Sequence, residues 1–253
     1  MKPTIKEQKW PDNIVIVRHG QSKRNVLREE AKATGGHADF SEGIRDQDTP
    51  LTPLGEMQAL SVGVALRSQF PDTGGRAYLS AEALAAPRAI DVIYVSPYLR
   101  TRQTKKKIIE GLGYTPEIVV DERIREIEFG LLDGLSHEGI KAKYPEEVKR
   151  RQREGKYWYR APGGESRPDV KMRLRSFIDT VVRDRREQNI VVVCHSVVVL
   201  ALRALLERWG EEEYLQVDKE NDVKNCSITH YAFNKSSRHL EVQEYNKVVY
   251  SEE

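Results

Sequence analysis

Hydrophobic positions along the chain gather into short continuous runs separated by polar residues. Residues 14–17 and 190–194 are apolar at every position, which is the pattern of strands buried on both faces of a sheet. Similar runs predict further strands over residues 90–95, 117–120, 226–233 and 240–245. We expect the last two of these strands to pair as neighbours.

The stretches between the strands predict helices. In residues 169–187, apolar positions from Val170 to Val182 recur at spacings of three and four, which gives one core-facing stripe. Thr52 and Pro53 suit the cap and first position of a helix, and Pro97 suits a helix start after Ser96. Helices are expected over residues 22–33, 52–70, 136–153 and 197–209. Strands alternating with helices predict an α/β fold.

The chain shows no internal repeat, low-complexity tract or linker, so we expect residues 1–253 to form a single domain with its core over about 13–246. Residues 71–89 are read as a loop with a short helix. Two segments, 34–48 and 131–165, are expected to be insertions that form the rim of a pocket. The side chains expected to form its basic and aromatic wall are Lys156, Tyr157, Trp158 and Arg160.

Charge and composition narrow the possible partners. The formal net charge is only +2, and the basic runs 105–107 and 149–151 lie among acidic residues, so no nucleic-acid partner is expected. No stretch is apolar for the length of a membrane span, and residues 1–10 lack the core of a signal peptide. We therefore expect a cytoplasmic protein with no membrane association.

The cysteine and histidine content gives no support for a metal site. Cys194 and Cys226 each lie in or beside an apolar run, which favours buried reduced thiols. The six histidines form no HxxxH or HxH pair, and the chain has no CxxC. No metal ligand set is therefore predicted.

Polar residues follow three of the predicted strands at the point where each strand ends. Arg18, His19 and Gly20 follow the first strand, Arg100 lies just beyond the second, and His195 follows the strand over 190–194. Ligands bind beyond the carboxyl ends of strands in open α/β sheets. Arginine offers forked donors to phosphoryl oxygens, and a neutral histidine can attack phosphorus. A carboxylic acid would then be the natural proton donor to the leaving oxygen.

The sequence around these residues resembles the histidine phosphatase superfamily, which includes the cofactor-dependent phosphoglycerate mutases. The similarity spans about residues 13–233. It is carried, in order, by Val17-Arg18-His19-Gly20-Gln21-Ser22 with Asn25; Leu51-Thr52 with Gly55 and Gln58-Ala59; Ser96-Pro97-Tyr98-Leu99-Arg100; Arg125-Glu126-Ile127-Glu128-Phe129-Gly130; Gly164-Glu165-Ser166; and Val193-Cys194-His195. The resemblance implies a three-layer α/β/α sandwich with a central, mostly parallel sheet.

The resemblance also implies a role for individual residues. His19 would be phosphorylated, while Arg18, Arg100 and His195 would hold the phosphoryl oxygens. Glu126 would protonate the leaving oxygen and then activate water. The rival for that acid role is Glu128, and further substrate contacts would come from Ser22, Asn25 and the backbone of Ser196, which stands where the family more often has glycine. No metal or other cofactor is required, and the expected substrate is a small-molecule phosphate ester.

The sequence fits other functions less well. The mutases usually carry Trp before the Asn of the first block and Arg after the catalytic Glu, whereas this chain has Arg24 and Ile127. This difference favours a phosphatase and leaves a mutase as the alternative. A non-catalytic adaptor would be expected to have lost a reactive residue. A serine esterase built on Ser196 would need glycines where Cys194 and Val198 stand. The substrate and the oligomeric state stay open.

Overall fold

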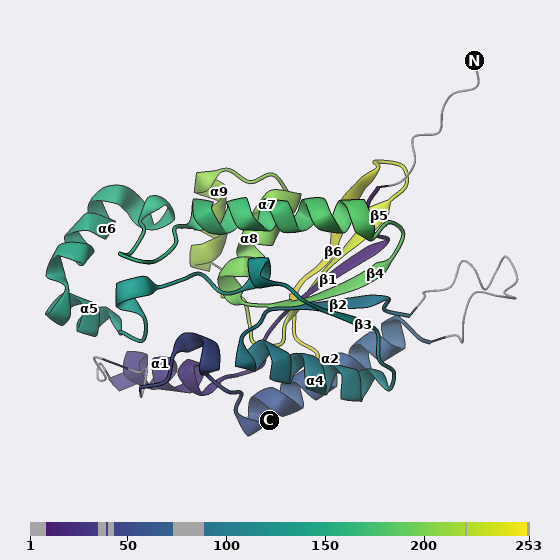
Figure 1. The fold of residues 1–253 in the computed structure, drawn as a ribbon, viewed down its shortest axis with the longest axis horizontal. Helices are drawn as coiled ribbons and strands as arrows, with labels where there is room; N and C mark the ends of the chain where they lie inside the picture. The colour runs from purple at the N-terminus through teal and green to yellow at the C-terminus, as the bar shows by residue number, and fades with distance from the viewer. Residues whose placement is uncertain (1–8, 35–38, 40–42, 73–88, 221, 252–253) are drawn as a thin grey trace, which may run out of the picture.

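A six-stranded sheet with strand order β3-β2-β4-β1-β5-β6 forms the centre of the computed structural model, which describes residues 9–34, 39, 43–72, 89–220 and 222–251 (Figure 1). The strands are β1 (Asn13–Arg18), β2 (Val92–Val95), β3 (Glu117–Val120), β4 (Asn189–Cys194), β5 (Ile228–Asn234) and β6 (His239–Lys247). Strands β3, β2, β4 and β1 run parallel to one another. Strand β5 is antiparallel to β1 and to β6. The mostly parallel sheet and the pairing of the two last strands are therefore confirmed.

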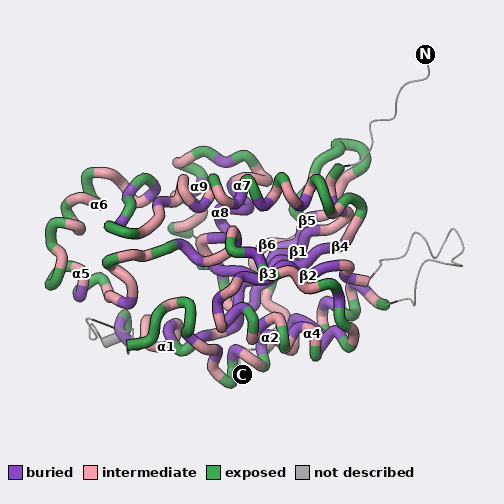
Figure 2. The backbone as a smooth tube through the Cα atoms, in the orientation of Figure 1, coloured by how far each residue is buried: buried purple, intermediate pink, exposed green. Residues whose placement is uncertain are grey.

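Helices cover both faces of the sheet, which gives the three layers. Ile14 and Ile16 of β1 belong to the core under α7 (Arg167–Asp184) and α8 (Ser196–Leu206). Val15 and Val17 point to the opposite face, where α2 (Pro53–Gln69) and α4 (Leu99–Leu112) pack. Figure 2 shows the central strands buried between these layers. Burial on both faces explains why β1, β2 and β4 are apolar without alternation, whereas β6, at the edge of the sheet, is mostly polar.

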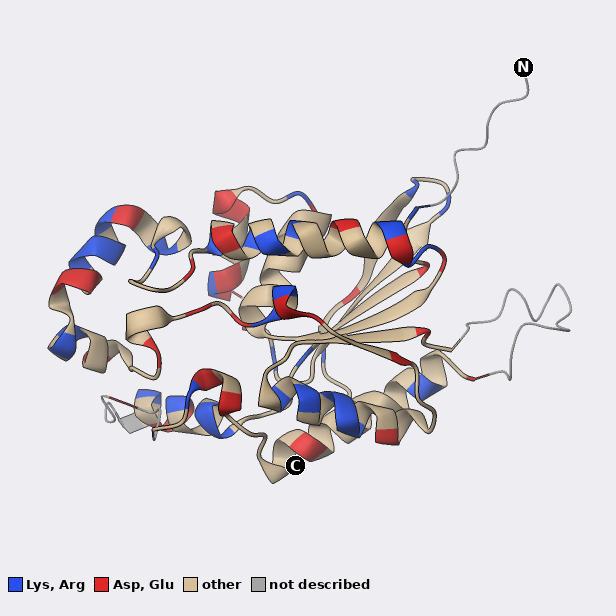
Figure 3. Ribbon diagram, viewed as in Figure 1, with Lys and Arg blue, Asp and Glu red and all other residues tan. Residues whose placement is uncertain are grey.

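The polar helices lie at the periphery of this core and contribute few residues to it. They are α1 (Lys23–Thr34), α5 (His137–Lys143), α6 (Pro145–Trp158) and α9 (Glu211–Glu220), and charged residues mark their surfaces in Figure 3. The prediction of one helix over 136–153 is wrong, because the chain breaks between α5 and α6. Pro145 starts α6, and a proline disfavours helical geometry in the residue before it. Helix α9 was not predicted, since most of its residues are polar and Tyr214 is its one buried residue.

The helix starts near the sheet follow the sequence with one exception. The Thr52 hydroxyl accepts from Gly55 N at 3.1 Å, and Pro53 occupies the first turn of α2, as predicted. Helix α4 begins at Leu99 rather than after Ser96, although Arg100 still lies in its first turn. The predicted short helix within 71–89 falls largely outside the described residues.

Gly20 and Gly55 bring the loop after β1 against the start of α2. A Cβ atom on Gly20 would lie 2.3 Å from the carbonyl oxygen of Gly55, so neither position has room for a side chain. This close approach fixes where the chain travels after it leaves β1. No helix in the described ranges is long and apolar enough to cross a membrane.

Candidate active site

Three strand exits meet at one edge of the sheet. His19 N donates to Cys194 O at 2.9 Å, and Ser96 N donates to Val193 O at 3.1 Å, so the ends of β1, β2 and β4 lie side by side. A cavity of about 160 Å³ opens beyond them. It is lined by Arg18, His19, Ser22, Arg24, Asn25, Arg28, Asp46, Arg100, Glu126, Phe129, Arg167, Ser196 and Val197.

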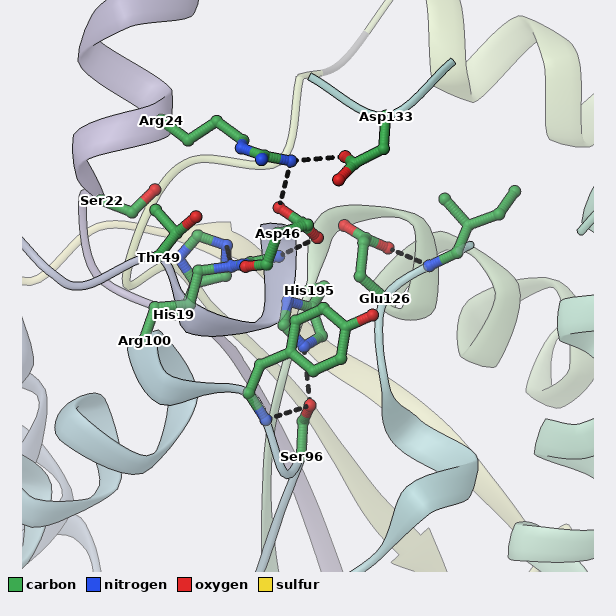
Figure 4. Close-up of polar contacts among 12 residues, drawn as sticks. His19, Ser22, Arg24, Asp46, Thr49, Ser96, Arg100, Glu126, Asp133 and His195 are labelled. Atoms are coloured by element: carbon green, nitrogen blue, oxygen red, sulfur yellow. Dashed lines mark hydrogen bonds and ion pairs between the residues drawn. The ribbon is translucent and has the colours of Figure 1, made fainter. Parts of the chain in front are cut away.

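The imidazole of His19 is buried and held in one tautomer. Its Nδ1 lies 2.7 Å from the carbonyl oxygen of Gly20, which can only accept, so the proton resides on Nδ1. The other nitrogen, Nε2, keeps its lone pair and accepts from Arg100 Nε at 3.2 Å (Figure 4). Burial, followed by the charges of Arg100 and Arg18, lowers the pKa of His19 well below its usual value. The surroundings of His19 therefore favour its neutral form, with the lone pair on Nε2.

The side chains of His195 and Arg18 lie near His19. The rings of His19 and His195 meet edge to face, with their centroids 5.3 Å apart. His195 Nε2 lies 2.8 Å from Ser96 Oγ, which sets the orientation of the second ring. The guanidinium of Arg18 donates through one terminal nitrogen to Val223 O. Within the described residues, His195 Nδ1 and Arg18 Nε are buried and have no hydrogen-bond partner.

The segment after β3 places Glu126 at the cavity. Ile124 and Ile127 are buried on either side of it, so the alternation of charged residues and isoleucine is the pattern of an anchored segment. Arg173 of α7 donates to the carbonyl oxygens of Arg123 and Glu126, at 2.5 and 3.1 Å. These contacts fix the backbone of the segment.

The two candidate acids differ in their surroundings. Glu126 is 7% exposed and lines the cavity, whereas Glu128 is exposed and lies outside the cavity lining. Burial raises the pKa of Glu126, although the Ile127 N–H, 2.9 Å from Oε1, and Arg100 oppose the shift. A buried carboxyl with a raised pKa retains its proton to a higher pH than a free glutamate, which suits a proton donor.

The three predicted substrate-binding residues also lie at the cavity. Ser22 Oγ donates to Asn25 Oδ1 at 2.9 Å, so the two side chains are held together at the start of α1. Ser196 is the first residue of α8, whose free N–H groups favour an anion. The eight predicted site residues are therefore close together.

Comparison with known proteins identifies the family. A profile of the histidine phosphatase superfamily (branch 1) matches residues 72–246. The chain belongs to this superfamily. The phosphoglycerate mutase-like protein AT74H of Arabidopsis thaliana is 29% identical over 237 residues, which cover 88% of this chain and 75% of that protein. Phosphoserine phosphatase 1 of Hydrogenobacter thermophilus is 32% identical over 172 residues, which cover 64% and 74%.

A solved structure supports the same fold. A mycobacterial glucosyl-3-phosphoglycerate phosphatase in complex with VO3 aligns with a TM-score of 0.64 and 25% identity. The alignment covers 93% of this histidine phosphatase superfamily member and 99% of the mycobacterial chain.

The prediction of which residues line the pocket is wrong in part. Segment 34–48 contributes Asp46, but the basic and aromatic residues expected from 131–165 lie outside the cavity lining. Lys156 pairs with Asp218 at 2.6 Å, Trp158 Nε1 donates to Glu211 at 2.6 Å, and Arg160 pairs with Asp169. Tyr157 is buried in the core. Side chains of this segment therefore stabilise the outer helices of the phosphatase fold.

The sequence did not reveal several other groups at this site. Asp46 contacts Arg24 and Arg100, and Asn225 donates to His19 O at 3.0 Å and to Asn25 Oδ1 at 3.2 Å. Neither residue stands in a periodic pattern. Asp46 is one of several acids in a polar loop, and Asn225 precedes a strand. Their roles become visible once distant segments are brought together.

Proposed function

We propose that this chain is a phosphomonoesterase that hydrolyses small phosphate esters through a phosphohistidine on His19. The observation that carries the proposal is the tautomer of His19. Its Nε2 bears a lone pair, faces Arg100 and is kept neutral by burial. A neutral imidazole nitrogen can attack phosphorus without a separate base.

In the first step, His19 Nε2 forms a bond to phosphorus and the ester oxygen leaves. Arg18, Arg100 and the unpartnered His195 Nδ1 would donate to the phosphoryl oxygens, where charge accumulates in the transition state. The protonated carboxyl of Glu126 would transfer its proton to the departing oxygen, so an alcohol is released. Ser22, Asn25 and the backbone at Ser196 would contribute further hydrogen bonds.

In the second step, Glu126 acts in the opposite direction. As a carboxylate it removes a proton from a water molecule, and the water oxygen attacks phosphorus while the bond to His19 Nε2 breaks. The products are inorganic phosphate and the original neutral imidazole, and Glu126 is again protonated. The same group therefore serves as acid and then as base.

We also propose that the reaction needs no metal. The cavity presents several guanidinium groups, which supply counter-charge to a phosphoryl dianion and repel a cation. In the described ranges, no three His, Cys, Asp or Glu side chains gather as a metal ligand set. Two buried free cysteines, Cys194 and Cys226, support a reducing compartment such as the cytoplasm. The groups proposed for catalysis meet at one edge of a single sheet, which supports a single catalytic domain.

The test is hydrolysis of p-nitrophenyl phosphate in the presence of EDTA, with detection of an acid-labile phosphoenzyme. We expect wild-type turnover and phosphate on His19, while His19→Asn loses activity by at least about 10³-fold. His137→Asn, at an exposed histidine of α5, is the matched control and should match the wild type. Phosphate transfer between phosphoglycerates with a bisphosphoglycerate primer, faster than hydrolysis, would favour the mutase alternative. Undiminished turnover by His19→Asn would overturn the proposal.

A further inference from the structure

A carboxylate lies among the arginines of the proposed phosphoryl site. Asp46 begins a short 3-10 helix, Asp46–Asp48, and its side chain is 13% exposed. Oδ1 accepts from Arg24 at 2.9 Å, and Oδ2 accepts from Arg100 at 2.9 Å (Figure 4). One acid therefore joins two arginines, both of which line the cavity.

Each of the three nitrogens of the Arg100 guanidinium has a partner. One terminal nitrogen donates to the Asp46 carbonyl oxygen at 2.6 Å, and the other donates to the Asp46 carboxylate. The remaining nitrogen, Nε, donates to His19 Nε2. A phosphoryl group on its way to His19 Nε2 needs donors from this same guanidinium. Because Asp46 already pairs with that guanidinium at 2.9 Å, the phosphoryl group and Asp46 compete for its positive charge.

A second arginine beside Asp46 allows the carboxylate to separate from Arg100. Arg24 is shared between Asp46 and Asp133, which lies 2.5 Å from it, so the acid has a second cation that remains when Arg100 turns to another anion. Asp46 can thus release Arg100 without becoming an unpaired buried charge, which would be costly. When a phosphoryl group takes Arg100, the Asp46 carboxylate stays paired with Arg24.

We propose that Asp46 is the internal counter-anion of the empty site: the substrate phosphoryl displaces it from Arg100, and its return expels inorganic phosphate. The inference rests on the proposed function. Asp46 positions Arg100 against His19 before substrate binds. After hydrolysis it repels the product dianion and takes the guanidinium back, so tight product binding is avoided.

The test is the Kd of inorganic phosphate, measured by calorimetry on the full chain, together with the competitive Ki of phosphate in turnover. Asp46→Asn and Asp46→Ala remove the competing charge, and we expect both constants to fall by about tenfold or more. Asp46→Glu keeps the charge and should bind phosphate nearly as the wild type does. Asp48→Asn is the matched control, since Asp48 lies in the same 3-10 helix with a side chain 51% exposed and pairs with Arg45.

A merely structural Asp46 predicts the opposite sign. If Asp46 only braced the loop, its removal would loosen Arg100, and phosphate would bind more weakly or equally in folded variants. If the wild-type chain hydrolyses the ester and the Asp46 variants bind phosphate more weakly or equally, the inference about Asp46 is overturned. The proposed function is then unaffected. Absence of both turnover and phosphate binding in the wild-type chain would instead contradict the proposed function.

Discussion

Arg100 Nε lies 3.2 Å from His19 Nε2, so a buried guanidinium donates to the imidazole nitrogen that carries the lone pair. Burial is the main cause of the lowered pKa of His19, and this contact adds to it, because a positive neighbour disfavours a second proton on the imidazole. It also places a forked donor beside the position that phosphorus must occupy. Arg100 thereby links the electrostatics of His19 to the binding of an anion.

Arg100→Lys tests this geometry apart from the charge. Lysine retains a cation but lacks the planar fork that can contact His19 and two phosphoryl oxygens together. We expect kcat/KM for a phosphate ester to fall by roughly 10²-fold. Arg102→Lys, at an exposed position of the same helix, should leave kcat/KM unchanged. Steady-state kinetics on the pair measure the difference, and equal effects would contradict the assigned role.

Glu126→Gln should separate the two chemical steps. The p-nitrophenolate group leaves without a proton, so His19 can still be phosphorylated, but the glutamine cannot activate water. We expect a burst of about one p-nitrophenol per active site and accumulation of phosphoenzyme. Rapid-quench kinetics report both quantities. The exposed neighbour Glu128 supplies the control, because Glu128→Gln should show normal steady turnover. A burst in that variant instead would reassign the acid.

The pH profile of the wild type follows from two opposite shifts. Burial lowers the pKa of His19, so its reactive neutral form persists to lower pH than that of a free histidine. Burial raises the pKa of Glu126, so its acid form persists to higher pH than that of a free glutamate. For an alkyl phosphate, kcat/KM should fall on the alkaline side as Glu126 loses its proton. A profile of kcat/KM against pH for the wild type and Glu126→Gln checks this, since the alkaline limb should vanish in the variant.

Asn225→Ala should weaken the loop that carries His19. Its side-chain amide donates to His19 O and to Asn25 Oδ1, at 3.0 and 3.2 Å, from a segment far along the chain. Loss of these bonds should cost about 1 kcal/mol in the free energy of unfolding. We also expect kcat/KM to fall about tenfold, because a displaced nucleophile attacks less efficiently. Urea denaturation and steady-state kinetics measure the two effects, with Gln243→Ala as a control at an exposed amide of β6.

Gly63→Ala should destabilise the packing of α2 on α4. A Cβ atom at Gly63 would lie 2.3 Å from the Ile108 carbonyl oxygen and 2.9 Å from Gly111 Cα, so the two helices would have to separate. We expect a loss of roughly 1–3 kcal/mol in unfolding free energy. Gly210→Ala meets no atom within 4 Å and should change stability by less than about 0.5 kcal/mol. Thermal or urea unfolding of the two variants compares them directly.

The sequence by itself determined the strands of the sheet and the residues closest to His19 in the proposed site. Apolar runs buried on both faces are visible without knowledge of their partners, and Arg18, Arg100 and His195 stand at or just beyond their ends. Because parallel strands end at one edge, local patterns were sufficient to bring these groups together. Glu126 was predicted from the resemblance to the histidine phosphatase superfamily.

Tertiary structure alone decided which other polar groups contact His19 and Arg100. The contact of Asp46 with Arg100 joins positions 54 residues apart, and that of Asn225 with His19 joins positions 206 apart. Such pairs leave no periodic pattern, because a hydrogen bond requires a donor and an acceptor to meet in space and places no constraint on their spacing along the chain. The same reason moved the expected wall residues of 131–165 away from the cavity, since the partners of Lys156, Trp158 and Arg160 lie in α7 and α9.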